Sequence, residues 1–127
     1  MPNLTLSILP DTLSICRLDP NERVPDWADA PSFVSITRTA DELSIVCLEQ
    51  AVPVGVNANR GWRCLKVESP LDLSLTGILT SLTGPLAEAR IGIFAISTFD
   101  TDYLLVKEQA LPDAIAALGK AGHKVQV

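Results

Sequence analysis

One stretch in the second half of the chain, Ile91–Glu108, constrains the fold more than any other. Apolar residues fill Ile91–Ile96 on both sides of the alternation, and six mostly polar, turn-forming residues follow. Tyr103–Val106 then resumes the apolar run. The pattern predicts a strand, a tight polar turn and a second strand. A hairpin that is apolar on both faces belongs in the middle of a sheet, so we expect the helices on either side of it to cover it.

The region before this hairpin predicts a strand and a helix. Trp62–Val67 has the alternation of a strand, and Ser74 is a suitable N-cap for a helix that runs to about Ala89. The apolar residues of that helix recur at helical spacing and would form one buried stripe. Pro85 lies inside the predicted helix and is expected to kink or break it, because proline lacks a backbone N–H.

The region after the hairpin predicts a second helix and a last strand. Pro112 suits the first turn of a helix, Gly122 suits its C-terminal cap, and Val125–Val127 alternates as a short strand. The second half therefore has the order β-α-β-β-α-β, which is the split βαβ pattern of a ferredoxin-like layer. We predict an α+β fold with antiparallel sheets and helices on one face.

The first half of the chain predicts short strands joined by turns. The loop Asp19–Pro31 holds three prolines and one helical turn near Trp27, and Glu49–Asn59 holds a short helical turn and a linker. The predicted strands are Leu4–Ile8, Leu13–Leu18, Phe33–Thr37 and Leu43–Leu48.

Two matches between the halves indicate an internal repeat, although matches this short also arise by chance. The segment ITRTADELSIV, from residue 36, matches ISTFDTDYLLV, from residue 96, at an offset of 60. The segment EQAVP, from residue 49, matches EQALP, from residue 108, at an offset of 59. We therefore predict an abbreviated N-terminal repeat over residues 1–59 and a complete domain over residues 60–127, with the boundary at Asn59-Arg60-Gly61.

The composition disfavours several classes of partner and site. The 127 residues carry a net charge of −5, whereas nucleic acids and anionic membranes are bound by concentrated Lys and Arg. Cys16, Cys47 and Cys64 form no C-x-x-C pair and fit buried thiols in a reducing cytoplasm. We expect no signal peptide, no membrane span, no cofactor and no metal. His123, the single histidine, lies just past a predicted helix and far in sequence from any second metal-type ligand.

The stretch from Ser69 to Val106 resembles an ACT domain, the small βαββαβ module that regulates amino-acid metabolism. The matching features are Gly77 near the start of the first helix, the Ala-Arg-Ile boundary after that helix, and the I-x-I-x-x-I-S end of the next strand. The segment STFDTDYLLV resembles more narrowly the bacterial tandem ACT proteins related to the aspartate kinase regulatory region and to the cytosolic arginine sensors. The segment SFVSITRTADELSIV resembles the abbreviated N-terminal repeat of that group, so the resemblance covers most of the chain.

The resemblance implies reversible binding of a free amino acid at an interface between two ACT units, and therefore a homodimer. Ligand contacts would come from the loop before the first helix and from the end of the second strand. The corresponding positions are Asp72, Leu73, Ser74, Leu75, Thr76 and Gly77, and then Ile96, Ser97, Thr98, Phe99, Asp100 and Asp102. Many members of the family carry an attached catalytic domain. We expect none here, which leaves open what the protein would regulate.

These residue types suit a zwitterion, but each has a simpler interpretation. The free N–H groups at a helix start attract a carboxylate, and carboxylates of the acidic turn attract an ammonium group. The acidic turn therefore favours a cationic ligand, lysine or arginine. Alternatively, Ser74 is a plain N-cap, Asp72 is a solvated loop charge, Asp100 and Asp102 only shape the turn, and Phe99 is an interface residue.

Two functional hypotheses follow from the sequence. The first is a non-catalytic, cytoplasmic regulatory protein that senses an amino acid. The alternative is a structural or interaction module without a ligand, which dimerises or regulates a partner enzyme. An enzymatic role is not supported, because the sequence offers no nucleophile–base pair, no phosphate-binding loop and no metal-ligand spacing.

Overall fold

A computed structural model of the chain describes residues 3–68 and 77–126. It contains two compact units. The larger unit comprises Met1–Pro10 and Arg63–Val127, and the smaller unit comprises Asp11–Trp62. The units are not the predicted division into residues 1–59 and 60–127, because the N-terminal strand pairs with strands of the second half. The predicted boundary at Asn59-Arg60-Gly61 lies within a single strand, Ala58–Val67, that continues from one unit into the other.

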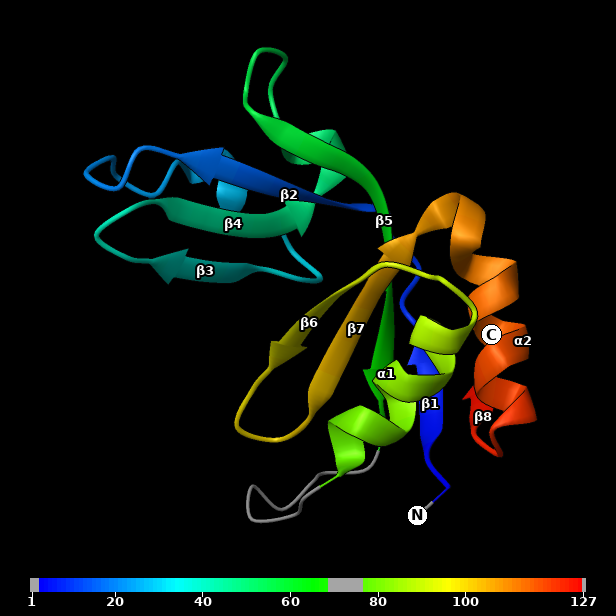
Figure 1. Cartoon of the computed structure of the whole chain (residues 1–127). Coiled ribbons are helices and arrows are strands. Elements are labelled where there is room, and N and C mark those ends of the chain that lie inside the picture. The colour runs from blue at the N-terminus through cyan, green and yellow to red at the C-terminus, as the bar shows by residue number, and fades with distance from the viewer. Residues whose placement is uncertain (1–2, 69–76, 127) are drawn as a thin grey trace. The chain divides into compact units, whose positions relative to one another are not determined.

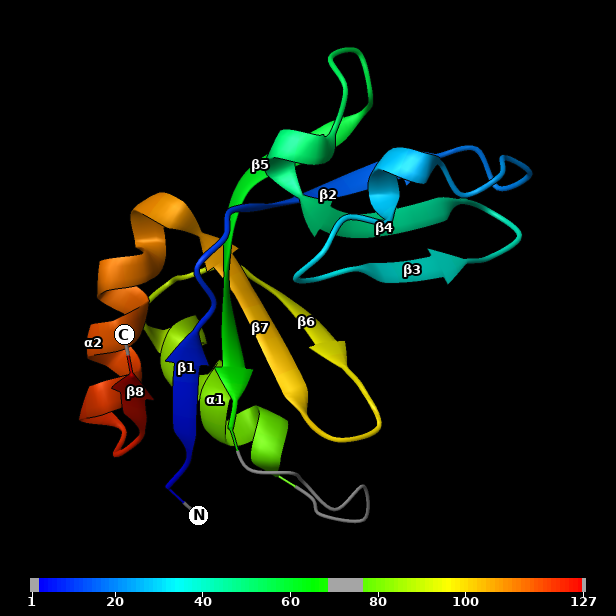
Figure 2. The ribbon, with the colours of Figure 1, turned by 180° about the vertical axis from the view of Figure 1, so that it is seen from behind.

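The larger unit is a sheet covered by two helices. Its strands lie in the order β8-β1-β5-β7-β6, and both helices lie on one face of it (Figures 1 and 2). β1 runs antiparallel to β5 and parallel to β8. The elements are β1 (Thr5–Ile8), β5 (Ala58–Val67), α1 (Ile78–Glu88), β6 (Ile93–Ser97), β7 (Asp102–Lys107), η3 (Glu108–Ala110), α2 (Leu111–Lys120) and β8 (Lys124–Gln126). The α+β, ferredoxin-like prediction is therefore confirmed.

The N-terminal strand makes this unit larger than a plain βαββαβ module. β1 lies between β5 and β8, which the simple order would place side by side. Leu4 and Leu6 of this segment are buried in the core that the two helices cover. The alternation of apolar residues predicted the strand correctly, but the strands that pair with it lie more than 50 residues away in the sequence.

The smaller unit is built from short strands and two single turns of 3₁₀ helix. Its strand order is β3-β4-β2-β5, and its small core includes Cys16, Ile45 and Cys47. The predicted helical turns near Trp27 and after Leu48 are both present. The elements are β2 (Leu13–Leu18), η1 (Asp26–Ala28), β3 (Ser35–Arg38), β4 (Leu43–Leu48) and η2 (Glu49–Ala51).

The central hairpin forms as predicted, but only half of it lies inside the sheet. β7 pairs with both β5 and β6, whereas β6 pairs with β7 alone among the described strands. Ala95 and Ser97 of β6 are exposed. The expectation that the whole hairpin lies mid-sheet was wrong for β6, because an apolar alternation shows that a strand is packed without showing how many strands flank it.

Helix α1 differs from its prediction at two points. It begins at Ile78 with Gly77 as N-cap, later than predicted, and Ser74 lies outside the described residues. Pro85 lies inside the helix, which continues to Glu88, so of the two expected effects, a kink or a break, the break does not occur. Among the described helices, none is long and apolar enough to cross a membrane.

The internal repeat is visible in the structure, in a single register. Thr39 N–H donates to the Glu42 carbonyl, and Thr98 N–H donates to the Thr101 carbonyl, both at 2.9 Å. Each E-Q-A segment forms a 3₁₀ turn directly after its strand. These equivalent positions are all 59 residues apart, so the offset of 60 for the first match was wrong by one residue.

Candidate functional site

The acidic turn of the predicted site is a four-residue β-turn, Thr98–Thr101, between β6 and β7. Besides the backbone bond, the Thr98 hydroxyl donates to the Thr101 carbonyl at 3.1 Å. At the base of the turn, Ser97 Oγ donates to Asp102 Oδ1 at 2.6 Å. These bonds hold the turn in one conformation, because both hydroxyls and one carboxylate oxygen have partners within it.

Thr101 attaches this turn to the end of β5. Its side chain is buried, and Oγ1 donates to the Val67 carbonyl at 2.8 Å. Val67 is the last residue of β5, and the chain leaves this strand toward α1. The end of β5, the β6–β7 turn and the N-terminus of α1 all lie at the same end of the larger unit (Figures 1 and 2). Strand ends and a helix start are thereby gathered at one end of the sheet.

The structure describes seven of the twelve predicted ligand residues. Asp72, Leu73, Ser74, Leu75 and Thr76 lie outside the described residues. Gly77 is exposed and has the left-handed conformation at the start of α1. The other six lie together at the end of β6, in the turn and at the start of β7: Ile96, Ser97, Thr98, Phe99, Asp100 and Asp102. Of these, Phe99 is the most exposed apolar side chain, at 82%.

Two residues that sequence reasoning did not select belong to this end of the unit. Thr101 sits between two predicted ligand residues, but only its contact with Val67 distinguishes it from its neighbours. Glu68 follows Val67 directly, is exposed, and donates its N–H to the Thr5 carbonyl at 2.9 Å. With Asp100 and Asp102 it brings three carboxylates to this end of the unit. Only its position directly after a predicted strand could have indicated that Glu68 belongs to the site.

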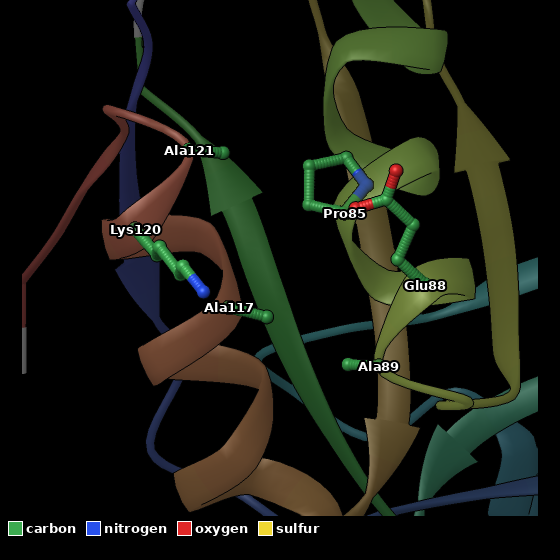
Figure 3. Close-up of a pocket in the computed structure, with 6 residues that line it drawn as sticks. All are labelled: Pro85, Glu88, Ala89, Ala117, Lys120 and Ala121. Atoms are coloured by element: carbon green, nitrogen blue, oxygen red, sulfur yellow. The ribbon is translucent and has the colours of Figure 1, made fainter.

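A second hollow lies away from this site, between the two helices. It has a volume of about 480 Å³ and is lined by small side chains, with Glu88 on α1 and Lys120 on α2 at its walls. Figure 3 shows Pro85 and Ala89 facing Ala117 across the groove. None of the seven predicted ligand residues that the structure describes lines it.

The buried ionisable groups of the described residues include three thiols and the imidazole of His123. Burial raises the pKa of the Cys64 thiol to about 12 and that of Cys47 to about 11, and it also raises the pKa of Cys16. A thiol with a raised pKa is a poor nucleophile and a poor metal ligand at neutral pH. In the described part of the chain, no cluster of three or more His, Cys, Asp or Glu residues could hold a metal ion.

A family model of the ACT domain matches residues 57–120, just over half of the chain. The chain belongs to the ACT domain family. A second model, which describes an N-terminal domain, matches residues 11–55, within the smaller unit. The ACT fold suggested by the sequence is thus confirmed by an independent comparison.

Relatives within this family include arginine sensors. The chain is 30% identical over 99 residues to the Bos taurus cytosolic arginine sensor for mTORC1 subunit 1, covering 69% of this chain and 30% of the sensor. It is 38% identical over 58 residues to the Homo sapiens protein of the same name, covering 45% of this chain and 18% of that protein. The chain therefore spans less than a third of the length of these sensors.

Solved structures agree on the fold. A crystal structure of a protein from Agobacterium tumefaciens is 46% identical, with a TM-score of 0.94 over 98% of this chain and 93% of that one. The regulatory subunit of aspartate kinase from Thermus flavus is 11% identical, with a TM-score of 0.64 over 94% of this chain and 99% of that one. At such low identity the second likeness concerns the fold alone. The resemblance to the arginine sensors is confirmed in sequence, and the resemblance to the aspartate kinase regulatory region is confirmed as one of fold.

Proposed function

We propose that this chain is a non-catalytic regulatory protein that binds a free amino acid at an interface between two ACT units. The name of its relatives, cytosolic arginine sensors, supports the ligand class and a cytoplasmic location. The observation that carries the proposal is the 2.8 Å bond from Thr101 Oγ1 to the Val67 carbonyl. It fastens the acidic turn to the end of β5, from which the chain runs toward Gly77 and α1.

This arrangement can recognise both charged groups of an amino acid. The start of α1 offers backbone N–H groups and the positive end of the helix dipole, which suit a carboxylate. Asp100 and Asp102, on either side of Thr101, and Glu68, next to its partner Val67, offer carboxylates for an ammonium or guanidinium group. Three acidic groups favour arginine or lysine over a neutral amino acid. The proposed contacts remain the twelve residues predicted from the sequence, with Thr101 as a positioning residue.

The outer strand of the larger unit supports a homodimer as the form that binds. β6 has a paired edge toward β7 and a second edge without a strand partner in the described part of the chain. Thr98 and Thr101 form the hydrogen-bonded pair that closes the turn. In an antiparallel ladder, hydrogen-bonded and non-hydrogen-bonded pairs alternate, so Ala95 and Leu104 form a non-hydrogen-bonded pair. The N–H of Ala95 therefore points to the second edge of β6. A second copy could pair along this edge and bring two acidic turns close to one interface.

The test of ligand binding is a thermal-unfolding screen against all twenty amino acids. A ligand that binds only the folded chain at 100 times its Kd stabilises it by about 2.7 kcal/mol, so a single amino acid should raise the midpoint by several degrees. Asp100→Asn should weaken this shift. Asp41→Asn is the matched control, because Asp41 occupies the equivalent position of the other repeat, 59 residues earlier. A screen without any shift at millimolar concentrations would refute the proposal.

The test of the interface is one proline substitution. Ala95→Pro removes an N–H from the outer edge of β6 while the ladder to β7 stays complete. We expect light scattering to report a dimer for the native chain and a monomer for this variant. Ile36→Pro is the matched control, because Ile36 has the equivalent position in β3, the outer strand of the smaller unit. Loss of the dimer in both variants alike would contradict a specific role for β6.

One contact favours the alternative, an interaction module without a ligand. Asp102 Oδ1 already accepts a 2.6 Å hydrogen bond from Ser97, so this carboxylate has a partner inside the chain. Under this alternative, Asp102→Asn changes the stability of the turn, leaves association unchanged and alters no response to amino acids. Under the proposal, the same substitution lowers the affinity for the amino acid.

A further inference from the structure

Pro85 creates a defect in helix α1 that the rest of the larger unit repairs. Proline has no backbone N–H, so the carbonyl of Ser81, four residues earlier, lacks the donor that an α-helix would supply. Ser81 is buried, with 8% of its surface exposed. A buried carbonyl without a donor destabilises the folded state by the full cost of its desolvation.

His123 supplies the missing donor. Its Nε2 lies 2.9 Å from the Ser81 carbonyl oxygen. Its Nδ1 accepts a hydrogen bond from the N–H of Leu4 at 3.1 Å. Since Nδ1 is an acceptor, it carries no proton, and the proton of the neutral ring must be on Nε2, where it points to Ser81. The imidazole, which is 7% exposed, therefore bridges α1 and the N-terminal segment.

We propose that His123 is a latch: in its neutral Nε2–H form it replaces the N–H that Pro85 lacks and ties α1 to the chain just before β1, and protonation opens it. Protonation adds a proton to Nδ1, which then faces the N–H of Leu4 as a second donor. The bond to Leu4 is lost, and two donors oppose each other in a buried place. The bond to Ser81 remains, so acid breaks only the hydrogen bond between His123 and the N-terminal segment.

In the described part of the chain, few charged side chains lie near the imidazole ring. Glu88 of α1 borders the same hollow of about 320 Å³ as His123. The chain before β1 contributes Asn3 to that hollow, and the turn after α2 contributes Ala121. Glu88 favours a charged imidazole, but its side chain is exposed and its effect is screened by water and salt. The N–H of Leu4 faces Nδ1 and opposes a proton there, whereas the Ser81 carbonyl accepts from Nε2 in either form of the ring.

The first test compares the acid sensitivity of the native chain with that of His123→Gln, which cannot titrate. We expect the thermal midpoint of the native chain to fall more steeply than that of the variant as the pH drops from about 7.5 to 5.5. Glu88→Gln is the control for the facing carboxylate and should leave the native chain at least as acid-sensitive. Equal slopes for the native chain and His123→Gln would overturn the proposal.

The second test does not depend on the stability of a variant. The imidazole ¹⁵N resonances of the native chain should show a protonated Nε2 and an unprotonated Nδ1 at neutral pH. A protonated Nδ1 would overturn the assignment.

The third test is a double-mutant cycle with Pro85→Ala, which restores an N–H to the helix. We expect His123→Gln to lower the midpoint less in the Pro85→Ala background, and purely additive effects would contradict the latch.

Discussion

At the scale of single residues, Cys64 has the strongest predicted dependence on pH. Burial raises its pKa from 9.0 to about 12. Above about pH 9 the thiol of the unfolded chain ionises while the folded chain keeps its proton, so stability is complete below pH 9 and is lost as pH rises toward 12. Each pH unit in that window costs about 1.4 kcal/mol. Denaturant unfolding at pH 8 and 10.5 should show a smaller loss for Cys64→Ala than for the native chain.

The same burial predicts how the thiols react. Cys16, Cys47 and Cys64 are all buried free cysteines. At neutral pH, iodoacetamide should leave all three unmodified in the folded chain and modify all three in denaturant. Mass spectrometry that finds an alkylated thiol under native conditions would show that the interior opens readily.

Thr101 gives a second prediction at this scale. Thr101→Val keeps the shape of the side chain and removes the hydroxyl that donates to the Val67 carbonyl. We expect a loss of about 1–2 kcal/mol in the free energy of unfolding, because a buried donor disappears. Thr98→Val removes an exposed hydroxyl from the same turn and should cost clearly less. Equal losses of unfolding free energy in the two variants would mean that the hydrogen bond from Thr101 to β5 adds no stability of its own.

At the scale of elements, the two helices end in the same way with different residues. After α1, Ile91 N–H donates to the Leu86 carbonyl and Arg90 N–H to that of Ala87. After α2, His123 and Gly122 make the corresponding bonds to Leu118 and Gly119. Both ends are Schellman motifs, which place one residue at positive φ. That residue is Gly122 in α2 but Arg90, with φ 61°, in α1.

This difference predicts opposite effects of exchanging side chains. Arg90→Gly should stabilise the chain by about 0.5–1 kcal/mol, because glycine adopts positive φ without a steric penalty. Gly122→Ala should destabilise it by about 1 kcal/mol or more. A Cβ at Gly122 would also lie 2.9 Å from Asn3 Oδ1. Chemical denaturation measures both, and a destabilising Arg90→Gly would show that the arginine side chain contributes more than its backbone strain costs.

At the scale of the whole molecule, the first residues of the chain complete a unit formed mostly by its second half. Leu6 of β1 is fully buried and lies between strands from residues 58–67 and 124–126. Leu6→Ala should cost about 2–5 kcal/mol of unfolding free energy. Leu79→Ala, at a helix position with 36% exposure, is the control and should cost about 1 kcal/mol or less. Hydrogen exchange at Lys124–Gln126 should rise in Leu6→Ala, since β8 pairs with β1.

The sequence by itself determined the features that depend on neighbouring residues. Leu13–Leu18 and Leu43–Leu48 form strands with the predicted bounds, because short apolar-rich runs between turns define them locally. The E-Q-A turns and the β6–β7 turn follow from local turn chemistry in the same way. Six predicted ligand residues therefore lie together, since one short turn contains them.

Tertiary structure decided what depends on residues far apart. The position of β1 between β5 and β8, the outer position of β6 and the bond from Thr101 to Val67 come from pairings that no local pattern encodes. Pro85 predicts a broken helix when read alone. The helix continues through it because His123 offers a donor to Ser81 from 42 residues away. A hydrogen bond needs only proximity in space, so the chain could repair a local defect with a residue that sequence reasoning had no reason to place there.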